Sequence, residues 1–452
     1  MTLIGIVSME VVKKATALLG QYPLCDYCLG RQFSMLGHGF TNGERGKAIK
    51  RLLILEGSKL LLEKDEYGET LLRQVAVNGF SEVSLSTLQA LGIEVELEET
   101  SCYICNNTFT DLDGLCEKVV EKLSNYEFNS FLVGVRVGYQ IEDREDELRA
   151  RFKVVWGESI RSDFSREIGK RIINAMGKEV AFNKPDILVT INPFTENISL
   201  KINSLFVYGR YRKLVRGIPQ AKWVCSQCGG LGCEKCQNTG KLYPDSVEEL
   251  ISRPLLQVTA GSDVKIHAAG REDIDARVLG SGRPFIIEIV NPAKRSVNLQ
   301  LLEKEINSTS EGKIEVEQLE FASKKLVIKL KAGEGAEKVY RAKVEFEENV
   351  SDEALSRLEE TMKQIVINQN TPTRVMHRRA HKLRKRRILN FKVKRLNSTL
   401  IEMVLRCEGG LYIKEFISGD GGRTSLSVSE ATMIPARCVE LDVMKVCLEE
   451  FN

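Results

Sequence analysis

The sequence predicts an α+β protein that is built from two or three domains and stabilised in part by metal-bound cysteines. The chain has 452 residues, which is more than one hydrophobic core usually serves. Segments with the apolar spacing of helices alternate along it with short runs that have the period-two pattern of strands. Eight of its twelve cysteines form four Cys-x-x-Cys pairs, a spacing typical of zinc sites in chains without an export signal.

The composition excludes several classes of protein. A hydrophobic content of 43% and a charged content of 28% are those of a globular chain rather than a disordered one. No run of about eighteen apolar residues is present, so we expect no membrane contact. The first apolar segment carries Glu10, Lys13 and Lys14, which interrupt the core that a signal peptide requires, and we expect a cytoplasmic protein. The net charge of +3 is too small to indicate nucleic-acid binding by itself.

The N-terminal part is predicted to be helical around a first metal site. Residues 5–20 and 43–63 have helical apolar spacing. Two separated cysteine pairs accompany these segments: Cys25, Cys28, Cys102 and Cys105. Because each pair offers two ligands and structural zinc takes four, we predict one shared zinc ion. Two separate redox or partial sites are the alternative, but no thioredoxin-like βαβ pattern surrounds either pair.

A second cysteine cluster is self-contained. It comprises Cys225, Cys228, Cys233 and Cys236. Glycines between the two pairs allow the loop to fold back, so all four thiolates can reach one ion without help from elsewhere. Four protein ligands leave no open position for water, which predicts a structural zinc rather than a catalytic one. The cluster lies at a change in composition, and we expect it to join two halves of the chain rigidly.

The region 115–220 is predicted to be an α/β module. Strand patterns occupy residues 131–137, 185–191 and 198–202, and residues 165–176 have helical spacing. Lys184–Ile187 followed by Gly209–Lys213 resembles a THUMP domain, an RNA-binding module of tRNA-modifying enzymes. Three cations beside Tyr211 are candidate RNA contacts: Arg210, Arg212 and Lys213. Phosphates attract such charge and bases can stack on the ring, whereas an ordinary solvated basic turn is the alternative.

The C-terminal half is predicted to be α+β. Strands are expected at residues 254–259, 263–268, 325–331 and 338–346, and helices at 297–306 and 352–367. Residues 371–397 then contain eleven Arg and Lys residues and no acid. Such a run repels itself unless it meets a polyanion, so we expect RNA contacts there, among them Arg374, Arg378 and Arg379. A solvated helix face is the alternative, but such a face usually mixes both signs.

The loop Gly270–Phe285 holds the candidate catalytic carboxylates. It combines three acids, three arginines and three glycines, and an apolar strand-like run follows it. Neighbouring guanidiniums keep a carboxylate ionised, and an ionised, positioned carboxylate can act as a nucleophile. A solvated loop with surface ion pairs is the alternative interpretation.

Three motifs in order carry a resemblance to pseudouridine synthases. The loop Gly270–Phe285 resembles their catalytic loop, Lys338–Ala342 their tyrosine strand and Gly410–Phe416 their basic-residue motif. With the N-terminal features and Thr371–Arg379, the chain is similar to the archaeal Pus-ten family of tRNA pseudouridine synthases. The resemblance implies a catalytic domain built on a mixed, mainly antiparallel sheet flanked by helices. The domains expected are a zinc-binding accessory part (1–114), a THUMP-like domain (115–220), a four-cysteine zinc knuckle (221–244) and the catalytic domain (245–452).

The resemblance also implies residue roles. Asp275 lies between Arg271 and Arg277 and is the preferred catalytic aspartate, while Asp273, in an Arg-Glu-Asp tripeptide, is the alternative. Contacts to the target base or to the catalytic carboxylate are expected from Tyr340, Tyr412, Ile413 and Lys414. Tyr340 would stack on the base, and Lys414 would pair with Asp275.

The implied function is isomerisation of uridine to pseudouridine in the T-arm of tRNA, at positions 54 and 55. The target base would be flipped out of its stack, with no organic cofactor and with two structural zinc ions. No nucleotide-binding glycine loop is present. We expect tRNA as the partner and a monomeric chain. A non-catalytic tRNA-binding or chaperone protein is the alternative function.

Overall fold

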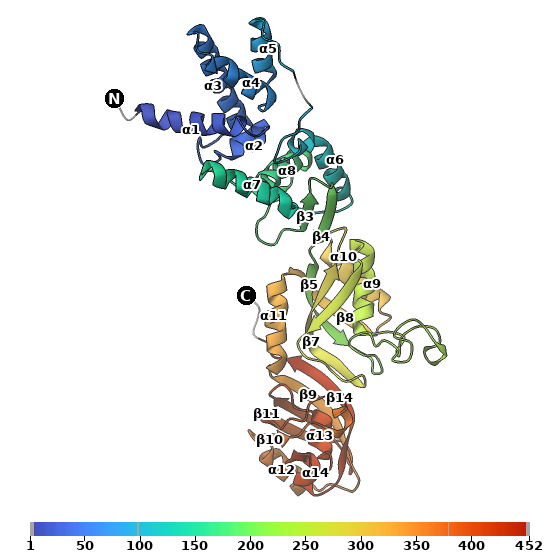
Figure 1. The fold of residues 1–452 in the computed structure, drawn as a ribbon. Helices are drawn as coiled ribbons and strands as arrows, with labels where there is room; N and C mark the ends of the chain where they lie inside the picture. Colours follow the sequence, from blue (N-terminus) through green and yellow to red (C-terminus); the bar gives the residue numbers. More distant parts are fainter. Residues whose placement is uncertain (1–3, 97–98, 378, 449–452) are drawn as a thin grey trace. The chain divides into compact units, whose positions relative to one another are not determined.

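The computed structural model describes residues 4–96, 99–377 and 379–448. Its contacts divide the chain into two units, Met1–Asn203 and Ser204–Asn452 (Figure 1). In the part of the chain so described, no helix is both long enough and apolar enough to cross a membrane.

The first unit is helical at its start and α/β at its end. Its helices are α1 (Ile4–Leu19), α2 (Asp26–Arg31), α3 (Asn42–Leu62), α4 (Tyr67–Val77), α5 (Glu82–Ala90), α6 (Leu112–Leu123), α7 (Tyr139–Phe152) and α8 (Ile160–Met176). Its strands are β1 (Ser130–Val135), β2 (Glu179–Val180), β3 (Ile187–Asn192) and β4 (Asn197–Ile202). Both N-terminal helices predicted from apolar spacing are therefore confirmed. Helix α3 begins where Thr41 and Glu44 form a capping box, which satisfies backbone N–H groups at the helix start.

The sheet of the first unit has the order β2-β1-β3-β4. Strand β1 runs parallel to β2 and β3, and β4 is antiparallel to β3. Ile187, Val189 and Ile191 on alternate positions of β3 are fully buried, as expected for a strand with one face on a core. Helix α8 packs on β1 and on α6.

The second unit is built on one mixed sheet. Its strands are β5 (Leu205–Lys213), β6 (Asp263–Ala268), β7 (Ala276–Val290), β8 (Ile314–Ala322), β9 (Lys338–Phe346), β10 (Val366–Gln369), β11 (Arg384–Arg395), β12 (Leu400–Cys407), β13 (Thr424–Ser425) and β14 (Ala436–Val446). Its helices are α9 (Val247–Thr259), α10 (Leu299–Thr309), α11 (Lys324–Ala332), α12 (Asp352–Thr361), α13 (Ile413–Ser418) and α14 (Val428–Thr432). The strand order is β13-β10-β11-β12-β9-β14-β7-β5-β8, with β6 paired to β7.

Strands β7 and β14 form the centre of this sheet. They pair in parallel, whereas the other neighbouring strands of the described sheet pair antiparallel. One core lies around β9, β11 and β12 and a second around β5, β7 and β8. Tyr340 on β9 packs against both cores. The mixed, mainly antiparallel sheet implied by the resemblance is thus present.

The structure corrects two predicted strands. Residues 254–259 lie in α9, because Ser246 caps a helix whose buried face includes Leu250, Ile251 and Leu255, and this packing accommodates an internal Pro254. Residues 325–331 lie in α11. Their period-two pattern is misleading, since the buried side chains are Val327 and Leu330, three positions apart, while Ile328 is exposed.

Two predicted boundaries also differ from the structure. Residues 205–213, which were expected to belong to the module 115–220, form strand β5, which pairs with β7 and β8 and belongs to the second unit. The helix expected at 352–367 ends at Thr361, and β10 begins at Val366. Helical spacing continues across that junction, but pairing of β10 with β11 and β13 determines the strand.

Candidate functional site

The structure brings the loop before β7 against the start of α13. Lys414 Nζ lies 2.7 and 2.6 Å from the two carboxylate oxygens of Asp275, although 139 residues separate them. The Asp275 side chain is 65% exposed while Lys414 is mostly covered. The carboxylate therefore faces solvent, and its ammonium partner is held against the protein.

The charge state of Asp275 follows from two opposing effects. Partial burial by itself raises the pKa of this carboxyl, but the hydrogen bonds and the positive charge of Lys414 outweigh it, so the pKa lies below its ordinary value. Arg374 lowers the pKa further by its charge. Asp275 is consequently ionised at neutral pH.

Asp273 has different surroundings from Asp275. Arg374 Nη2 lies 3.0 Å from its carboxylate, and Lys414 Nζ lies 3.6 Å away. Arg374 also pairs with the buried Glu415, at 2.5 Å. Asp273 is thus part of a bridge that ties the loop to α13, whereas Asp275 pairs with Lys414 and keeps 65% of its side chain exposed.

A buried polar cluster supports the loop from below. Glu272 accepts hydrogen bonds from the Tyr211 hydroxyl at 2.9 and 3.0 Å, and its carboxylate lies 2.9 Å from Nε of Arg283. Lys213 Nζ donates to the carbonyl oxygens of Asp273 and Ile274 at 3.2 and 3.1 Å. The side chains of Tyr211, Lys213, Glu272 and Arg283 are buried, so they fix the backbone that carries both aspartates.

This cluster corrects the predicted RNA contacts on β5. Lys213 and Tyr211 are fully buried and cannot meet phosphate or stack on a base. Arg212 pairs with Glu315 and Glu317, at 3.0 and 3.3 Å. These acids are on β8, about 100 residues away in the chain, and only strand register places them opposite.

Arg210 likewise has partners within the second unit. Its guanidinium donates to the carbonyl oxygens of Ser281 and Gly282 at 2.6 and 3.2 Å. The RNA-contact interpretation of β5 therefore fails for Lys213, and the two arginines serve contacts inside the fold.

Two adjoining cavities open beside the aspartates. The smaller, of about 300 Å³, is lined by Trp223, Arg271, Asp273, Asp275, Arg374, Arg379, Tyr412, Lys414 and neighbouring residues. The larger, of about 390 Å³, shares Arg271, Asp273, Arg374, Arg379, Tyr412 and Lys414 with it and adds Tyr340, Ile413, Arg283, Arg384, Arg386 and others. Concave sites of this size with convergent polar groups are typical of ligand-binding pockets.

The predicted base-contact residues line the larger cavity. Tyr340 is half-buried, and burial raises the pKa of its phenol, so the hydroxyl is neutral. Two guanidiniums lie close to the Tyr412 ring, those of Arg374 and Arg384, at 5.9 and 5.4 Å from its centroid. Ile413 is buried at the start of α13. Val443 on β14 is paired with Tyr340 on β9 and with Val278 on β7, which explains why these distant motifs converge.

The basic run 371–397 is divided between two faces. Arg379, Arg384 and Arg386 line the larger cavity, and no carboxylate within 4 Å of them is found in the described residues. Lys385, Arg387, Lys392 and Lys394 occupy exposed positions of β11. Arg374 is committed to Asp273 and Glu415, and Arg378 lies outside the described residues.

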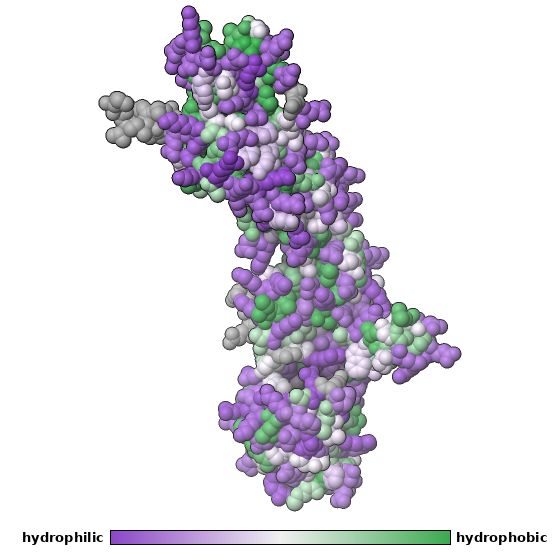
Figure 2. All heavy atoms as spheres, viewed as in Figure 1, coloured by the Kyte–Doolittle hydropathy of each residue, from purple (hydrophilic) through white to green (hydrophobic). Residues whose placement is uncertain are grey.

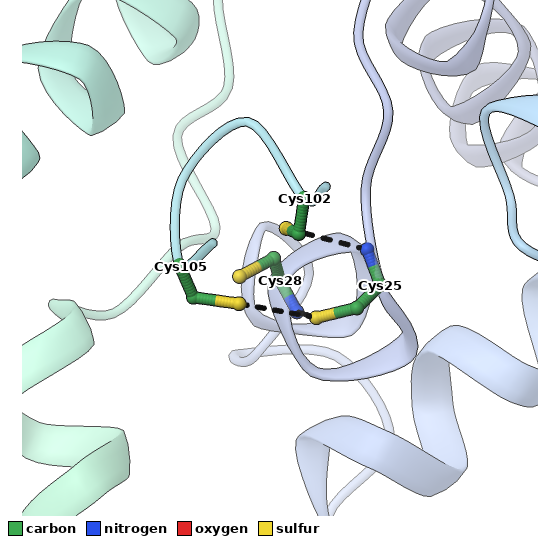
Figure 3. Close-up of side chains that lie close together, drawn as sticks. All are labelled: Cys25, Cys28, Cys102 and Cys105. Atoms are coloured by element: carbon green, nitrogen blue, oxygen red, sulfur yellow. Dashed lines mark hydrogen bonds between the residues drawn. The ribbon is translucent and has the colours of Figure 1, made fainter. Parts of the chain in front are cut away.

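The two cysteine pairs of the first unit converge (Figure 3). The sulfur atoms of Cys25, Cys28, Cys102 and Cys105 all lie within 4.8 Å of one another. A tetrahedral zinc with bonds of about 2.3 Å would separate its ligands by about 3.8 Å, and the Cys25 and Cys105 sulfurs are 3.6 Å apart. The buried Arg31 donates to the Cys28 sulfur at 3.4 Å, so the donor set fits one ion.

The second cysteine cluster has the same geometry. The sulfurs of Cys225 and Cys233 are 3.9 Å apart, and those of Cys228 and Cys236 are 3.8 Å apart. Backbone N–H groups of Gly232 and Gly240 donate to two of these sulfurs. Such N–H bonds stabilise thiolates, and the set also fits one ion.

The structure identifies site residues that the sequence analysis missed. Glu272 and Arg283 form the buried pair under the loop, and Trp223 lines the smaller cavity. Glu272 stood beside two other acids and could have been noticed, but nothing local distinguishes the buried acid from the exposed ones.

Comparisons with known proteins cover both units. A family model described as "Pus10, C-terminal" matches residues 206–447, and one described as "Pus10 THUMP domain, archaeal" matches residues 115–192. A protein of Methanocaldococcus jannaschii called "tRNA pseudouridine synthase Pus10" is 42% identical over 449 residues, which are 98% of this chain and 94% of that protein. A protein of the same name from Methanothrix thermoacetophila is 39% identical over 445 residues, 97% of this chain and 95% of that protein.

Proposed function

Because the chain belongs to the Pus10 family, whose curated members are tRNA pseudouridine synthases, we propose that it isomerises uridines 54 and 55 in the T-arm of tRNA with Asp275 as the catalytic carboxylate. The observation that carries the assignment of Asp275 is its pairing with Lys414 at 2.6 Å, beside a cavity that the basic motif also lines and that adjoins the cavity lined by Tyr340.

The reaction rearranges bonds within one nucleotide. The bond between uracil N1 and ribose C1′ breaks, the freed base rotates, and C5 bonds to C1′. The proton that leaves C5 is balanced by the proton that N1 gains, so no oxidant, reductant or organic cofactor is consumed. Asp275 acts as the nucleophile or assists departure of uracil, and Lys414 keeps it ionised for this step.

The cavity residues hold the displaced base. Flipping a uridine out of its stack costs a few kcal/mol, and stacking on Tyr340 offsets part of that cost. Since burial raises the pKa of Tyr340, we assign it to stacking and to hydrogen-bond donation rather than to proton removal as a phenolate. Tyr412 and Ile413 form the remaining wall.

Cations on the cavity side bind the RNA backbone. Arg379, Arg384 and Arg386 supply positive charge without a carboxylate partner in the described residues, which suits phosphate neutralisation. Arg374 acts differently, because its pairs with Asp273 and Glu415 fix the loop against α13.

Zinc at the two four-cysteine sites has a structural role. The first ion would be held by Cys25, Cys28, Cys102 and Cys105, and the second by Cys225, Cys228, Cys233 and Cys236. An ion with four thiolates cross-links its loops and has no position for substrate.

Conversion of unmodified tRNA tests the proposal. Asp275→Asn is expected to abolish pseudouridine formation while the Kd for tRNA changes less than about threefold, because the substitution keeps the shape of the side chain. Asp273→Asn is the matched control and is expected to retain conversion. Retained conversion in Asp275→Asn would transfer the role to Asp273, and absence of conversion by the wild-type chain would leave only a tRNA-binding function.

A further inference from the structure

Trp223 has no role in the function proposed above, yet it lines the cavity that contains Asp275, Tyr412 and Lys414. It lies near the start of the zinc knuckle (221–244), whose cysteine loop, residues 224–242, lies between β5 and α9 and projects from the second unit (Figure 1). Trp223 is only partly buried. A tryptophan in a core would be covered on both faces, so its position beside the candidate catalytic aspartate requires another explanation.

The knuckle holds this tryptophan in place through its backbone. Leu242 N donates to the carbonyl oxygen of Trp223 at 3.0 Å, and Cys225 N donates to that of Gly240 at 2.9 Å. The rings of Trp223 and Tyr243 meet edge to face with centroids 5.6 Å apart. These contacts join the start and the end of the knuckle and aim the indole at the cavity.

The catalytic loop provides a second contact to the ring. The guanidinium carbon of Arg271 lies 5.9 Å from the centroid of the Trp223 ring. Arg271 also lines both cavities. A tryptophan and an arginine side by side at an open site form the kind of surface on which proteins stack unpaired bases.

A metal ion at the four cysteines would be the principal support of the knuckle. Of residues 224–242 only Cys225, Cys236 and Gly240 are buried, so the loop has no hydrophobic core. Leu231, near its middle, is 95% exposed, and Figure 2 shows apolar surface on the projecting loop. A loop of this composition is ordered by the four thiolates and their ion, and its order determines the position of Trp223.

We propose that Trp223 is a nucleotide-stacking residue of the substrate site, presented by the zinc knuckle. Everting a uridine removes a stacking partner from each neighbouring base. The indole replaces one of these partners for a base next to the flipped uridine, while Tyr340 stacks on the flipped base itself. This inference rests on the proposed function. It gives the second metal site a task other than the predicted joining of two halves of the chain, because the knuckle lies within the second unit.

Fluorescence tests the stacking directly, because the chain has two tryptophans, Trp156 and Trp223. Trp156 packs on Phe33 in the first unit, and Trp156→Phe preserves an aromatic ring there. In this variant, prepared with its metal, unmodified tRNA is expected to quench the single remaining tryptophan with the same Kd that a separate binding assay gives. Binding without a change in the emission of Trp223 would overturn the proposal.

Substitution separates stacking from a structural role. Trp223→Ala is expected to lower kcat/KM about tenfold, the value of one base–aromatic stack, and Trp223→Phe to lower it less than about threefold. Leu231→Ala, at an exposed position of the same knuckle, is the control and is expected to match the wild type. An Ala variant with unchanged kcat/KM, or a Phe variant as impaired as the Ala variant, would refute stacking.

A cysteine variant tests the presentation by the knuckle. Cys228→Ser in the Trp156→Phe background is expected to lose one metal ion per chain and at least about half of the quenching amplitude. Full quenching after loss of that ion would contradict the role given to the knuckle. Pseudouridine formation by the wild-type chain is measured separately, so a failure of the proposed function is distinguishable from a failure of this inference.

Discussion

Replacing Glu272 by glutamine removes one buried negative charge from the loop that carries Asp273 and Asp275 and keeps the shape of the side chain. In the native fold the carboxylate and the Arg283 guanidinium are both buried, with Nε and Oε2 2.9 Å apart. Burial by itself lowers the pKa of Arg283, but the charge of Glu272 outweighs this effect, and the pKa stays above its ordinary value. An arginine does not deprotonate in proteins, so in Glu272→Gln the buried guanidinium of Arg283 keeps its charge and loses its counter-charge.

The expected cost is large for a single substitution. Breaking a buried pair by neutralising one partner costs about 3–5 kcal/mol, whereas a domain is stable by about 5–15 kcal/mol. With a urea dependence of about 2–3 kcal/mol per molar, the unfolding midpoint of the second unit should fall by about 1–2.5 M.

Urea unfolding of the Trp156→Phe background measures this shift, because its single tryptophan, Trp223, reports on the second unit. Glu345→Gln is the matched control, since Glu345 pairs with Arg437 at an exposed position and its loss should cost less than about 1 kcal/mol. Equal shifts for Glu272→Gln and Glu345→Gln would refute the reasoning.

A double variant checks the cause. Glu272→Met with Arg283→Met replaces the pair by apolar side chains of similar length, so no unpaired charge remains buried. Its midpoint is expected to lie above that of Glu272→Gln. A midpoint below the single variant would mean that the lost stability comes from packing or from the Tyr211 hydrogen bond and not from the stranded charge.

The other predictions concern the charge of Asp275, the basic cavity wall and the metals. Lys414→Met removes the group that lowers the pKa of Asp275. Since the active carboxylate is lost as pH falls through that pKa, the acidic limb of the kcat/KM profile should move to higher pH. An unmoved limb would contradict the pairing. Arg386→Ala should reduce the slope of log Kd for tRNA against log salt by about 0.9. Lys392→Ala, at an exposed position of β11, should leave this slope unchanged. Equal slopes in both variants would exclude phosphate contact by Arg386. Elemental analysis should find two zinc ions per chain and Cys28→Ser should contain one, whereas metal-free protein as purified would overturn both metal-site assignments.

Local patterns in the sequence were sufficient to predict the features that depend on residues close together in the chain. The spacing of Cys225 and Cys228 places two thiolates on one turn, and the order of the loop, tyrosine and basic motifs indicated which segments converge. Apolar spacing located elements such as α1, α3 and β9. It failed for residues 254–259 and 325–331, where the buried face is set by neighbouring elements rather than by the local alternation.

Which charges are free depends on the fold. Arg212 appeared unopposed in the sequence, yet β8 supplies Glu315 and Glu317 through strand register. Asp273 and Asp275 differ by two positions, and only the placement of Arg374 and Lys414 makes one a structural bridge and leaves the other open. The sequence indicates the chemistry that each segment can offer, because ligand spacing and side-chain type are local properties. Burial and pairing require partners about 100 or more residues away, so the availability of each group emerged only when the two sheet cores brought those partners together.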